Sequence, residues 1–300
     1  MRDDGGMDNP RAPTSSSTDA LLVAVVGTLN LDLVVRTDRR PRVGETVMGT
    51  SYLERPGGKG ANQALAAADI GPTALIGAVG DDDAGTTMRR HQDAAGVDTR
   101  HVIEVAGASG RAVIEVDSDG DNSIIVICGA NDQVSAAHVT AALDALAPKV
   151  VLTQLESPRS VTSAVVGWTE GGDCRFILNP SPVAPLDNNI LSAADPFVVN
   201  AVEAEYYCDD RRLTDPGDMA RRLLEVARSV VITLGARGVV VATGGSVETF
   251  DVEKVHAYDT TGAGDHFVGS LAAYLAAGSD LQSAARRSAA RATEYVASPR

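Results

Sequence analysis

The stretch with the clearest chemical potential is "AYDTTGAGDHF", residues 257–267, where an aspartate follows a turn that carries two glycines. Gly262, Ala263 and Gly264 can let successive backbone N–H groups point into one concavity at the start of a helix, and such a site attracts negative charge. Asp265 would repel a phosphate there, unless it acts as a general base while the N–H groups stabilise a transferring phosphoryl group. The same residues also suit a helix N-cap in a tight turn, so this string alone leaves both interpretations open.

A second stretch, "ERPGGKGANQA" at residues 54–64, places glycines, a cation and an amide at the start of an apolar helix. Gly57 and Gly58 permit close approach of the backbone to a ligand, Lys59 supplies a positive charge, and Asn62 offers both a donor and an acceptor. This set suits a polyhydroxylated ligand. A phosphate-binding P-loop would need a Ser or Thr after the lysine, which this string lacks. A plain helix start with a solvated lysine remains the alternative.

Other polar residues directly follow apolar runs that read as strands. In open α/β sheets, ligands bind beyond the carboxyl ends of the strands. The residues in question are Asn30 and Asp32 in "TLNLD", Glu156 in "TQLE", Asn200 and Glu203 in "NAVEAE", and Thr233, Gly235, Arg237 and Gly238 in "TLGARG". Taken singly, each also has a structural interpretation as a strand-end turn, a solvated carboxylate, a helix N-cap or a loop.

The elements that must position these residues alternate along the chain. The short apolar runs are "LLVAVVG", "ALIGAVG", "SIIVIC", "VVLTQL", "RFILN", "FVVN", "SVVITL" and "GVVVAT". Runs that are apolar throughout are typical of strands buried on both faces. Because helical segments lie between them, the sequence predicts an α/β fold with a mostly parallel sheet and helices on both sides.

Two of the intervening helices carry the residues with chemical potential. One is predicted in "GANQALAAADIG", and the other starts near Asp265. Their apolar faces are Ala61, Ala64, Leu65 and Ala68 in the first, and Phe267, Leu271, Tyr274 and Leu275 in the second.

Residues 32–53 and 110–127 break this alternation, because neither stretch has room for a helix. Both show partial alternation of apolar and polar residues, with turn chemistry at residues 40–42 and 119–121. They are predicted to form hairpins of a small antiparallel sheet outside the main one, which would act as a lid.

The composition sets limits on the class of protein. Three hundred residues with 44% hydrophobic residues indicate an ordinary globular protein with a substantial core. The net charge of −14 argues against non-specific binding to nucleic acid, which requires clustered Lys and Arg. A small anion can still be held locally by glycine-rich loops and helix N-termini.

The ends of the chain and its cysteines suggest a cytoplasmic protein. Residues 1–19 are rich in Gly, Pro, Ser and charge, and we expect a disordered leader followed by one folded domain over residues 20–300. The first apolar run is too short to cross a membrane and lacks the features of a signal peptide. Cys128, Cys174 and Cys208 are widely spaced, as expected for free thiols in a reducing compartment.

Five motifs taken together, "GGKGANQA", "TQLE", "NAVEAE", "TLGARG" and "DTTGAGD", resemble in their order and separation the ribokinase-like (PfkB) carbohydrate kinase family. The resemblance runs from about Leu21 to about Ala297. "GGKGAN" points to the ribokinase branch of that family. The family fold implied is a three-layer α/β/α structure with a mostly parallel central sheet and a small β-sheet lid.

The resemblance implies a role for each matching residue. Asp265 would be the catalytic base, and the turn Gly262, Ala263 and Gly264 would stabilise the phosphoryl group. The sugar would be bound by Asn30, Asp32, Gly58, Lys59, Asn62, Glu156 and Asp265. The nucleotide would be bound by Asn200, Thr233, Gly235, Arg237, Gly238 and Gly264. Glu203 would assist Mg²⁺, and Asp259 and Thr261 would hold a monovalent cation, usually K⁺. A Lys59–Glu156 pair across the pocket is also expected.

The sequence departs from the family pattern at two places. Where the family continues past the last helix into a turn that supplies further cation and adenine groups, this chain ends at "YVASPR". The cation site is therefore expected to be incomplete. His266 stands where a small hydroxyl residue is expected, and it could perturb the charge of Asp265 or point to solvent.

The activity implied is ATP-dependent phosphorylation of D-ribose at its 5-hydroxyl group, by a cytoplasmic homodimer that binds neither nucleic acid nor membrane. One alternative is a related kinase for a nucleoside or another sugar. A nucleoside needs apolar room for its base, which disagrees with Lys59 and Glu156. Another alternative is a catalytically weak sugar-binding or regulatory homologue.

Overall fold

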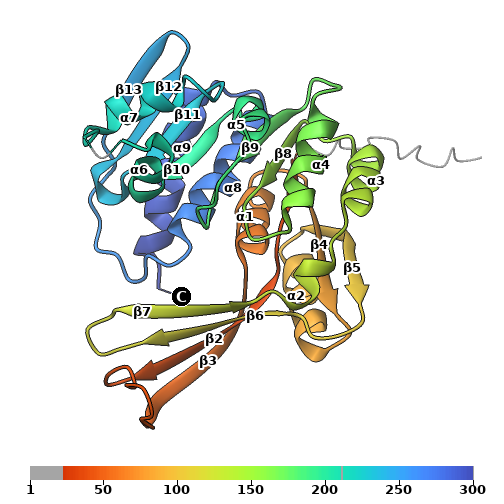
Figure 1. Ribbon diagram of the computed structural model, residues 1–300, viewed down its shortest axis with the longest axis vertical. Coiled ribbons are helices and arrows are strands. Elements are labelled where there is room, and N and C mark those ends of the chain that lie inside the picture. Colours follow the sequence, from red (N-terminus) through yellow and green to blue (C-terminus); the bar gives the residue numbers. More distant parts are fainter. Residues whose placement is uncertain (1–22, 211, 300) are drawn as a thin grey trace, which may run out of the picture.

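A computed structural model describes residues 23–210 and 212–299, and the predicted leader at residues 1–19 lies outside this part. A nine-stranded sheet forms the middle layer, with the strand order β13-β12-β11-β10-β9-β8-β1-β4-β5 (Figure 1). Its strands are β1 (Val23–Val26), β4 (Thr73–Gly80), β5 (Asp98–Val105), β8 (Val150–Thr153), β9 (Arg175–Leu178), β10 (Phe197–Asn200), β11 (Val230–Thr233), β12 (Val239–Thr243) and β13 (Ser246–Phe250). The strands from β11 to β5 pair in parallel, and only β12 and β13 at one edge are antiparallel.

Helices cover both faces of this sheet, as the alternation of the sequence predicted. Residues Val23 and Val25 of β1 belong to one hydrophobic core and Ala24 and Val26 to a second, so this strand is buried on both sides. The first core includes residues of α1 (Lys59–Ala68), α2 (Asp83–Ala94), α8 (Ala263–Ala276) and α9 (Leu281–Ala297). The second includes residues of α3 (Ala136–Leu146), α4 (Arg159–Thr169), α5 (Asn188–Ala193), α6 (Ala201–Cys208) and α7 (Pro216–Leu223). No helix in the described part is long and apolar enough to cross a membrane.

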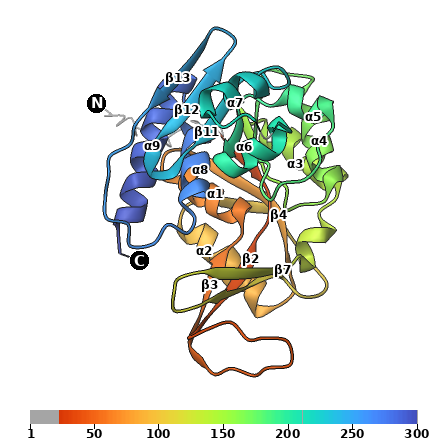
Figure 2. The same ribbon diagram turned by 60° about the vertical axis from the view of Figure 1, so that its left-hand side comes forward.

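The two predicted hairpins form a separate four-stranded sheet. Its strands are β2 (Asn30–Thr37), β3 (Gly49–Gly57), β6 (Gly110–Val116) and β7 (Asn122–Ile127), in the order β3-β2-β6-β7. Each hairpin is antiparallel, but the two central strands β2 and β6 run parallel, so the sheet is mixed rather than fully antiparallel. It extends away from the three-layer body beside the amino end of α1 (Figures 1 and 2).

The strand β7 does not lie in the main sheet, although its apolar run suggested burial on both faces. Ile124, Ile125, Val126 and Ile127 keep between 47% and 65% of their surface exposed. The strand forms one edge of the small sheet, so both of its faces and its free edge are accessible. The apolar run therefore predicts a strand correctly at this position, but hydrophobicity alone does not indicate which elements cover that strand.

Close packing of α1 against α8 joins the two helices that carry the motifs. Gly269 of α8 faces α1, and a Cβ at this position would lie 2.2 Å from the carbonyl oxygen of Gln63 and 2.9 Å from the Cβ of Ala66. Real Cβ atoms do not approach a backbone oxygen so closely. Only glycine at position 269 lets the two helices come together at this separation.

We expect Gly269→Ala to destabilise the protein by about 1–3 kcal/mol, because the added methyl group meets the backbone of α1 rather than a flexible side chain. The midpoint of thermal unfolding measures the effect. Gly167, inside α4, is the matched control, because nothing lies within 4 Å of the position that its Cβ would take. Gly167→Ala should be neutral or stabilise by about 0.5–1 kcal/mol. Equal midpoints for the two variants would contradict the close contact.

Candidate active site

The turn before Asp265 starts α8 with a left-handed residue. Gly262 is the N-cap, with φ of 80° and ψ of 0°. The N–H group of Ala263 donates to the carbonyl oxygen of Thr260 at 3.2 Å, while that of His266 continues the helix by donating to Gly262. Gly262, Gly264 and Asp265 line a pocket. The amino end of α8, with its partial positive charge, therefore faces this pocket.

The carboxylate of Asp265 contacts the helix that follows the glycine-lysine motif, about 200 positions earlier in the sequence. Asn62 donates from Nδ2 to Oδ2 of Asp265 at 3.2 Å, and Gln63 donates from Nε2 to Oδ1 at 2.9 Å. The two motifs that the sequence analysis singled out thus meet in one place. Each oxygen of the carboxylate has an amide donor of its own.

The environment of Asp265 acts on its pKa in two directions. Burial raises the pKa of Asp265, and the charge of Glu156 adds to this effect. The positive charge of Lys59 and the hydrogen bonds from Gln63 and Asn62 lower it, without cancelling the effect of burial. A carboxylate that is held by donors but poorly solvated is a stronger base than an exposed aspartate.

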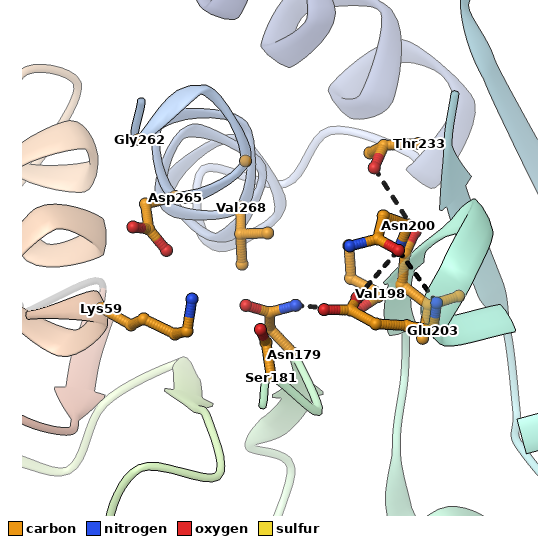
Figure 3. A pocket seen from close by; sticks show the side chains of 12 residues that line it. Lys59, Asn179, Ser181, Val198, Asn200, Glu203, Thr233, Gly262, Asp265 and Val268 are labelled. Carbon is orange, nitrogen blue, oxygen red and sulfur yellow. Dashed lines mark hydrogen bonds between the residues drawn. The ribbon is translucent and has the colours of Figure 1, made fainter. Parts of the chain in front are cut away.

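The start of α1 touches the segment after β1. Gly58, the N-cap of α1, has φ of 94°, and a Cβ there would lie 2.8 Å from the carbonyl oxygen of Thr28 and 2.9 Å from the nitrogen of Asn30. Both the conformation and the close approach require glycine. Lys59 follows, and its ammonium group points into the pocket between Asp265 and Asn179 (Figure 3).

Glu156, which follows β8, approaches the same helix start. Its Oε2 atom accepts hydrogen bonds from the hydroxyl of Thr28 and from the backbone N–H of Lys59, the latter at 3.1 Å. Glu156 thus contacts the backbone of Lys59, while the side chain of Lys59 reaches into the pocket, so the contact differs from the expected pair across the pocket.

Asn30 and Asp32 lie on β2, at the junction of the small sheet and the body. Oδ1 of Asn30 accepts a hydrogen bond from Nδ2 of Asn131, at 2.9 Å, within η1 (Gly129–Gln133). Burial raises the pKa of Asp32 to about 6, opposed by the charge of Arg55 and reinforced by the charges of Glu156 and Asp265. Asp32 is thus close enough to both carboxylates to feel their charge.

The pocket itself is small and polar, with a volume of about 160 Å³. Figure 3 shows Lys59 and Asp265 on one side, Asn200, Glu203 and Thr233 on the other, and Asn179 and Ser181 between them. Asn200 and Glu203 form a capping box at the start of α6, in which each side chain accepts from the other residue's backbone N–H at 2.9 Å. Asn200 and Glu203 in "NAVEAE" therefore do form a helix N-cap, and both residues also line the pocket.

A larger and mainly apolar cavity of about 470 Å³ adjoins the polar pocket, and Thr233 and Gly264 line both. It lies between the β11–β12 loop, residues 252–257, and the helices α8 and α9. Of the predicted nucleotide residues, Gly235 and Gly238 line it, whereas Arg237 in η2 (Gly235–Arg237) does not and is exposed. An apolar cavity that reaches the amino end of a helix has the shape and polarity that suit a nucleotide base.

The predicted cation residues lie on the loop before α8. The N–H group of Thr261 donates to Oδ1 of Asp259 at 2.8 Å, and a guanidinium nitrogen of Arg55 in the small sheet lies 3.9 Å from Oδ2. The ring of His266 stacks on that of Tyr295 in α9, with centroids 4.4 Å apart. His266 is therefore half-buried against α9, with its ring held by this stack.

Several side chains that shape the site were not predicted. Gln63 donates to Asp265 and is itself bonded to Gln154 and Asn179, and Thr28 and Asn131 bond to Glu156 and Asn30. Gln63 and Gln154 were visible as polar residues inside apolar segments. A buried polar side chain needs a partner, and that is the signal that could have identified them.

Comparison with known proteins gives a consistent answer. Residues 20–299 match the pfkB family of carbohydrate kinases. The chain is 36% identical over 269 residues to a ribokinase of Bacillus subtilis, covering 88% of this chain and 89% of that protein.

Solved structures agree in fold over almost the whole chain. The ribokinase of Thermotoga maritima superposes with a TM-score of 0.85 at 30% identity, covering 93% of each chain. A ribokinase of Arabidopsis thaliana, in complex with ribose and ATP, superposes with a TM-score of 0.83 at 27% identity, covering 92% of this chain and 93% of that one. From the family match and this site, we conclude that the chain belongs to the pfkB family of carbohydrate kinases.

Proposed function

We propose that the protein is an ATP-dependent kinase that converts D-ribose into ribose 5-phosphate, with release of ADP. The observation that carries this proposal is the convergence of Asp265, Asn62 and Lys59 on one polar pocket, beside an apolar cavity that also ends at α8. A sugar hydroxyl and a nucleotide phosphate would meet at this junction. The similarity to ribokinases supports ribose as the sugar.

In the proposed reaction, the oxygen of the sugar's 5-hydroxyl group attacks the γ-phosphorus of ATP, and Asp265 accepts the proton of that hydroxyl group. A new O–P bond forms, the bond between the γ-phosphorus and the bridging oxygen breaks, and ADP leaves with the electron pair. The backbone N–H groups of Gly262 and Gly264, which line the pocket, would face the negative charge on the transferred group, whereas the N–H group of Ala263 donates to Thr260. Lys59 supplies a further positive charge to the same pocket.

Sugar recognition would fall to groups from the small sheet and from the body. Asp32 and Asn30 present oxygens from β2, Asn62 and Gly58 lie at the start of α1, and Glu156 accepts a hydrogen bond from the backbone there. Carboxylates and amides of this kind bind vicinal hydroxyls, because each can accept or donate at two atoms.

Mg²⁺ is expected with the nucleotide rather than in a cage made by the protein. Within residues 23–210 and 212–299, no group of three or more His, Cys, Asp or Glu side chains could hold a metal ion. Glu203 faces the pocket and uses Oε2 to cap α6, which suits an ion bound mainly by phosphates and water. Such an ion would neutralise charge on the phosphates. Asn200 and Thr233 would lie beside them.

We propose that Asp259 and Thr261 bind a monovalent cation, K⁺, since they offer carboxylate and hydroxyl oxygens at the turn before α8. Such an ion would add positive charge next to the proposed anion site. We also propose a cytoplasmic location, which the three free cysteines support.

A homodimer through the small sheet is part of the proposal. Tyr52 and Leu53 on β3 and the run from Ile124 to Ile127 on β7 expose large apolar side chains on one small sheet. Exposed apolar groups gathered in this way are typical of surfaces that another protein covers. A second copy of the chain offers a matching set by symmetry.

The first test is ADP release with ribose, Mg²⁺ and ATP, in K⁺ and in Na⁺ buffers, with fructose and several nucleosides as competing substrates. We expect ribose to be preferred and K⁺ to activate. Asp265→Ala should reduce kcat by about 10²–10⁴, the usual contribution of a general base, while ribose still binds. Calorimetry measures the binding.

Asp83 is the matched control, because it is an exposed acid in the first turn of another helix, α2. Asp83→Ala should keep the activity of the unmodified protein. An Asp265→Ala variant with full turnover would exclude the proposed base. Ribose binding without any ADP release from the unmodified protein would instead favour a sugar-binding homologue.

A second prediction concerns pH, because Asp32 has a pKa of about 6 in the folded protein, above its ordinary 3.8. Below pH 6 the protonated side chain loses acceptor capacity, so the KM for ribose should rise as pH falls, and Asp32→Asn should abolish this dependence.

The raised pKa of Asp32 also means that its ionised side chain destabilises the fold above about pH 4. Asp32→Asn should therefore raise the thermal midpoint at pH 7 and have no effect below pH 4. A lower midpoint at pH 7 would show that burial is not the dominant effect.

A third prediction tests the dimer. Ile125→Asp should convert a dimer into a monomer in light scattering after size-exclusion chromatography, because it places a charge in the apolar surface of β7. Val226→Asp, an exposed valine outside the small sheet, is the control and should leave the mass unchanged. A monomeric mass for the unmodified protein at tens of micromolar would refute the proposed assembly.

A further inference from the structure

Next to Asp265, three amide side chains are largely buried, and one of them, Asn179, also lines the pocket. Gln63 of α1 is 0% exposed, Gln154 after β8 is 1% exposed, and Asn179 after β9 is 9% exposed. They come from three different segments of the chain. Burying an amide costs free energy, because the side chain must be desolvated and ordered, so these three amides are expected to form specific hydrogen bonds.

The hydrogen bonds between these amides run in one direction. Gln154 donates from Nε2 to Oε1 of Gln63 at 2.6 Å. Gln63 then donates from Nε2 to Oδ1 of Asn179 at 3.0 Å and to Oδ1 of Asp265 at 2.9 Å. Asn179 donates from Nδ2 to the carbonyl oxygen of Val198 at 3.1 Å. The chain of donors ends on the carboxylate.

This arrangement fixes which end of Gln63 faces Asp265. If the amide of Gln63 were reversed, its oxygen would face two oxygens, those of Asn179 and Asp265, and its nitrogen would face the nitrogen of Gln154. The backbone carbonyl of Val198 prevents Asn179 from reversing to accommodate the change. Gln63 is therefore held as a donor to Asp265.

Gln154 is held in place by the backbone around it. A Cβ at Gly27 would lie 2.3 Å from Oε1 of Gln154, so this glycine leaves just enough room for the amide. Among the described residues, Oε1 of Gln154 has no hydrogen-bond partner. An unpaired buried acceptor is unfavourable, and the amide keeps this orientation while its other end donates to Gln63.

We propose that Gln63, oriented by Gln154 and Asn179, is a positioning residue that fixes the carboxylate of Asp265 for proton transfer. The inference rests on the proposed function, in which Asp265 is the base. Gln63 would act only through Asp265, holding Oδ1 at the back while the carboxylate faces the pocket. Asn62, at 3.2 Å from Oδ2, provides a second and longer contact.

The charged groups around Asp265 act on its pKa, and this pKa is the quantity that would change if the Gln63 donor were lost. Lys59 on α1, Glu156 after β8 and Asp32 on β2 act on or are coupled to Asp265, and on α8 the next residue is His266, stacked on Tyr295 of α9. Burial raises the pKa of Asp265, while the charge of Lys59 and the bond from Gln63 lower it. Without the Gln63 donor, the pKa should rise further.

The experiment compares Gln63→Met, Gln154→Met and Gln92→Met in the full chain. Methionine keeps the length of the side chain and removes the donor. Gln92 of α2 is the matched control, because it is also buried, at 1% exposure, and its Nε2 donates to Ala61 of the same helix α1, away from Asp265. For each variant, kcat with ribose is measured against pH, together with ribose binding and the thermal midpoint.

Gln63→Met should lower kcat at neutral pH by about ten- to hundredfold. It should also move the acidic limb of the plot of kcat against pH up by about one pH unit. Both effects are of the size expected for the loss of a hydrogen bond to a charged group. Ribose affinity should change little. Gln154→Met should move the limb in the same direction by less, since it removes one of the groups that orient Gln63 and leaves the contacts of Gln63 with Asn179 and Asp265. Gln92→Met should leave the limb in place, even if its thermal midpoint falls equally.

A second measurement does not depend on turnover. The carboxyl carbon of Asp265, observed by NMR after selective ¹³C labelling of aspartate and assigned with Asp265→Asn, should titrate at higher pH in Gln63→Met than in the unmodified chain. An unchanged limb and titration in both Gln63→Met and Gln154→Met, or an equal shift in Gln92→Met, would overturn the proposal. Absence of ribose-dependent ADP release from the unmodified protein would refute the proposed function alone. If Gln63→Met does not fold, Gln154→Met decides the question.

Discussion

The site depends on the contact between α1 and α8, which brings residues 200 positions apart within hydrogen-bond distance. Gly269 lets the two helices approach until the backbone of Gln63 would touch a Cβ at that position. One turn before Gly269, Asp265 receives the amides of Asn62 and Gln63. The same packing therefore fixes both the separation of the helices and the direction in which the carboxylate points.

Electrostatics explains why so many uncharged donors surround this contact. Asp32, Glu156 and Asp265 interact with one another, and burial raises the pKa of both aspartates. A second cation beside Lys59 would neutralise the carboxylates, but it would also lower the basicity of Asp265, the proposed base. Amide donors stabilise an ionised carboxylate without removing its basicity to the same degree. The site accordingly pairs one lysine with several amides.

The sequence predicted the strands and motifs well where one local signal was enough. Apolar runs identified the buried parallel strands, and glycine-rich turns identified the starts of α1 and α8. It did not predict β5 and β13, whose apolar residues alternate with charged ones, and for β7 it gave two interpretations, a doubly buried strand and a lid hairpin, of which the second is correct. Those features depend on which neighbour covers each strand, and a single sequence contains no such information.

The site shows the same limit at the level of single residues. Asp265 and Asn62 could be identified from motifs, because their backbone surroundings are encoded locally by glycines. Gln63, Gln154 and Asn179 could not, because their roles arise only when three segments meet. His266 is a related case, since its partner Tyr295 lies on another helix. Long-range contacts between ordinary polar residues have no local signature.

The site is divided between the three-layer body and the small sheet. This division separates the groups that are in place before a ligand binds from those that a ligand would affect. Asp265 and its amide donors all lie within the three-layer body, where packing holds them before any ligand arrives. Asp32 lies on β2 of the small sheet, poorly solvated and close to two other carboxylates. A sugar hydroxyl donating to Asp32 would relieve that unfavourable state. In the proposed reaction, part of the sugar's binding energy would then come from solvating the buried charge of Asp32, while Asp265, the proposed base, would need no rearrangement.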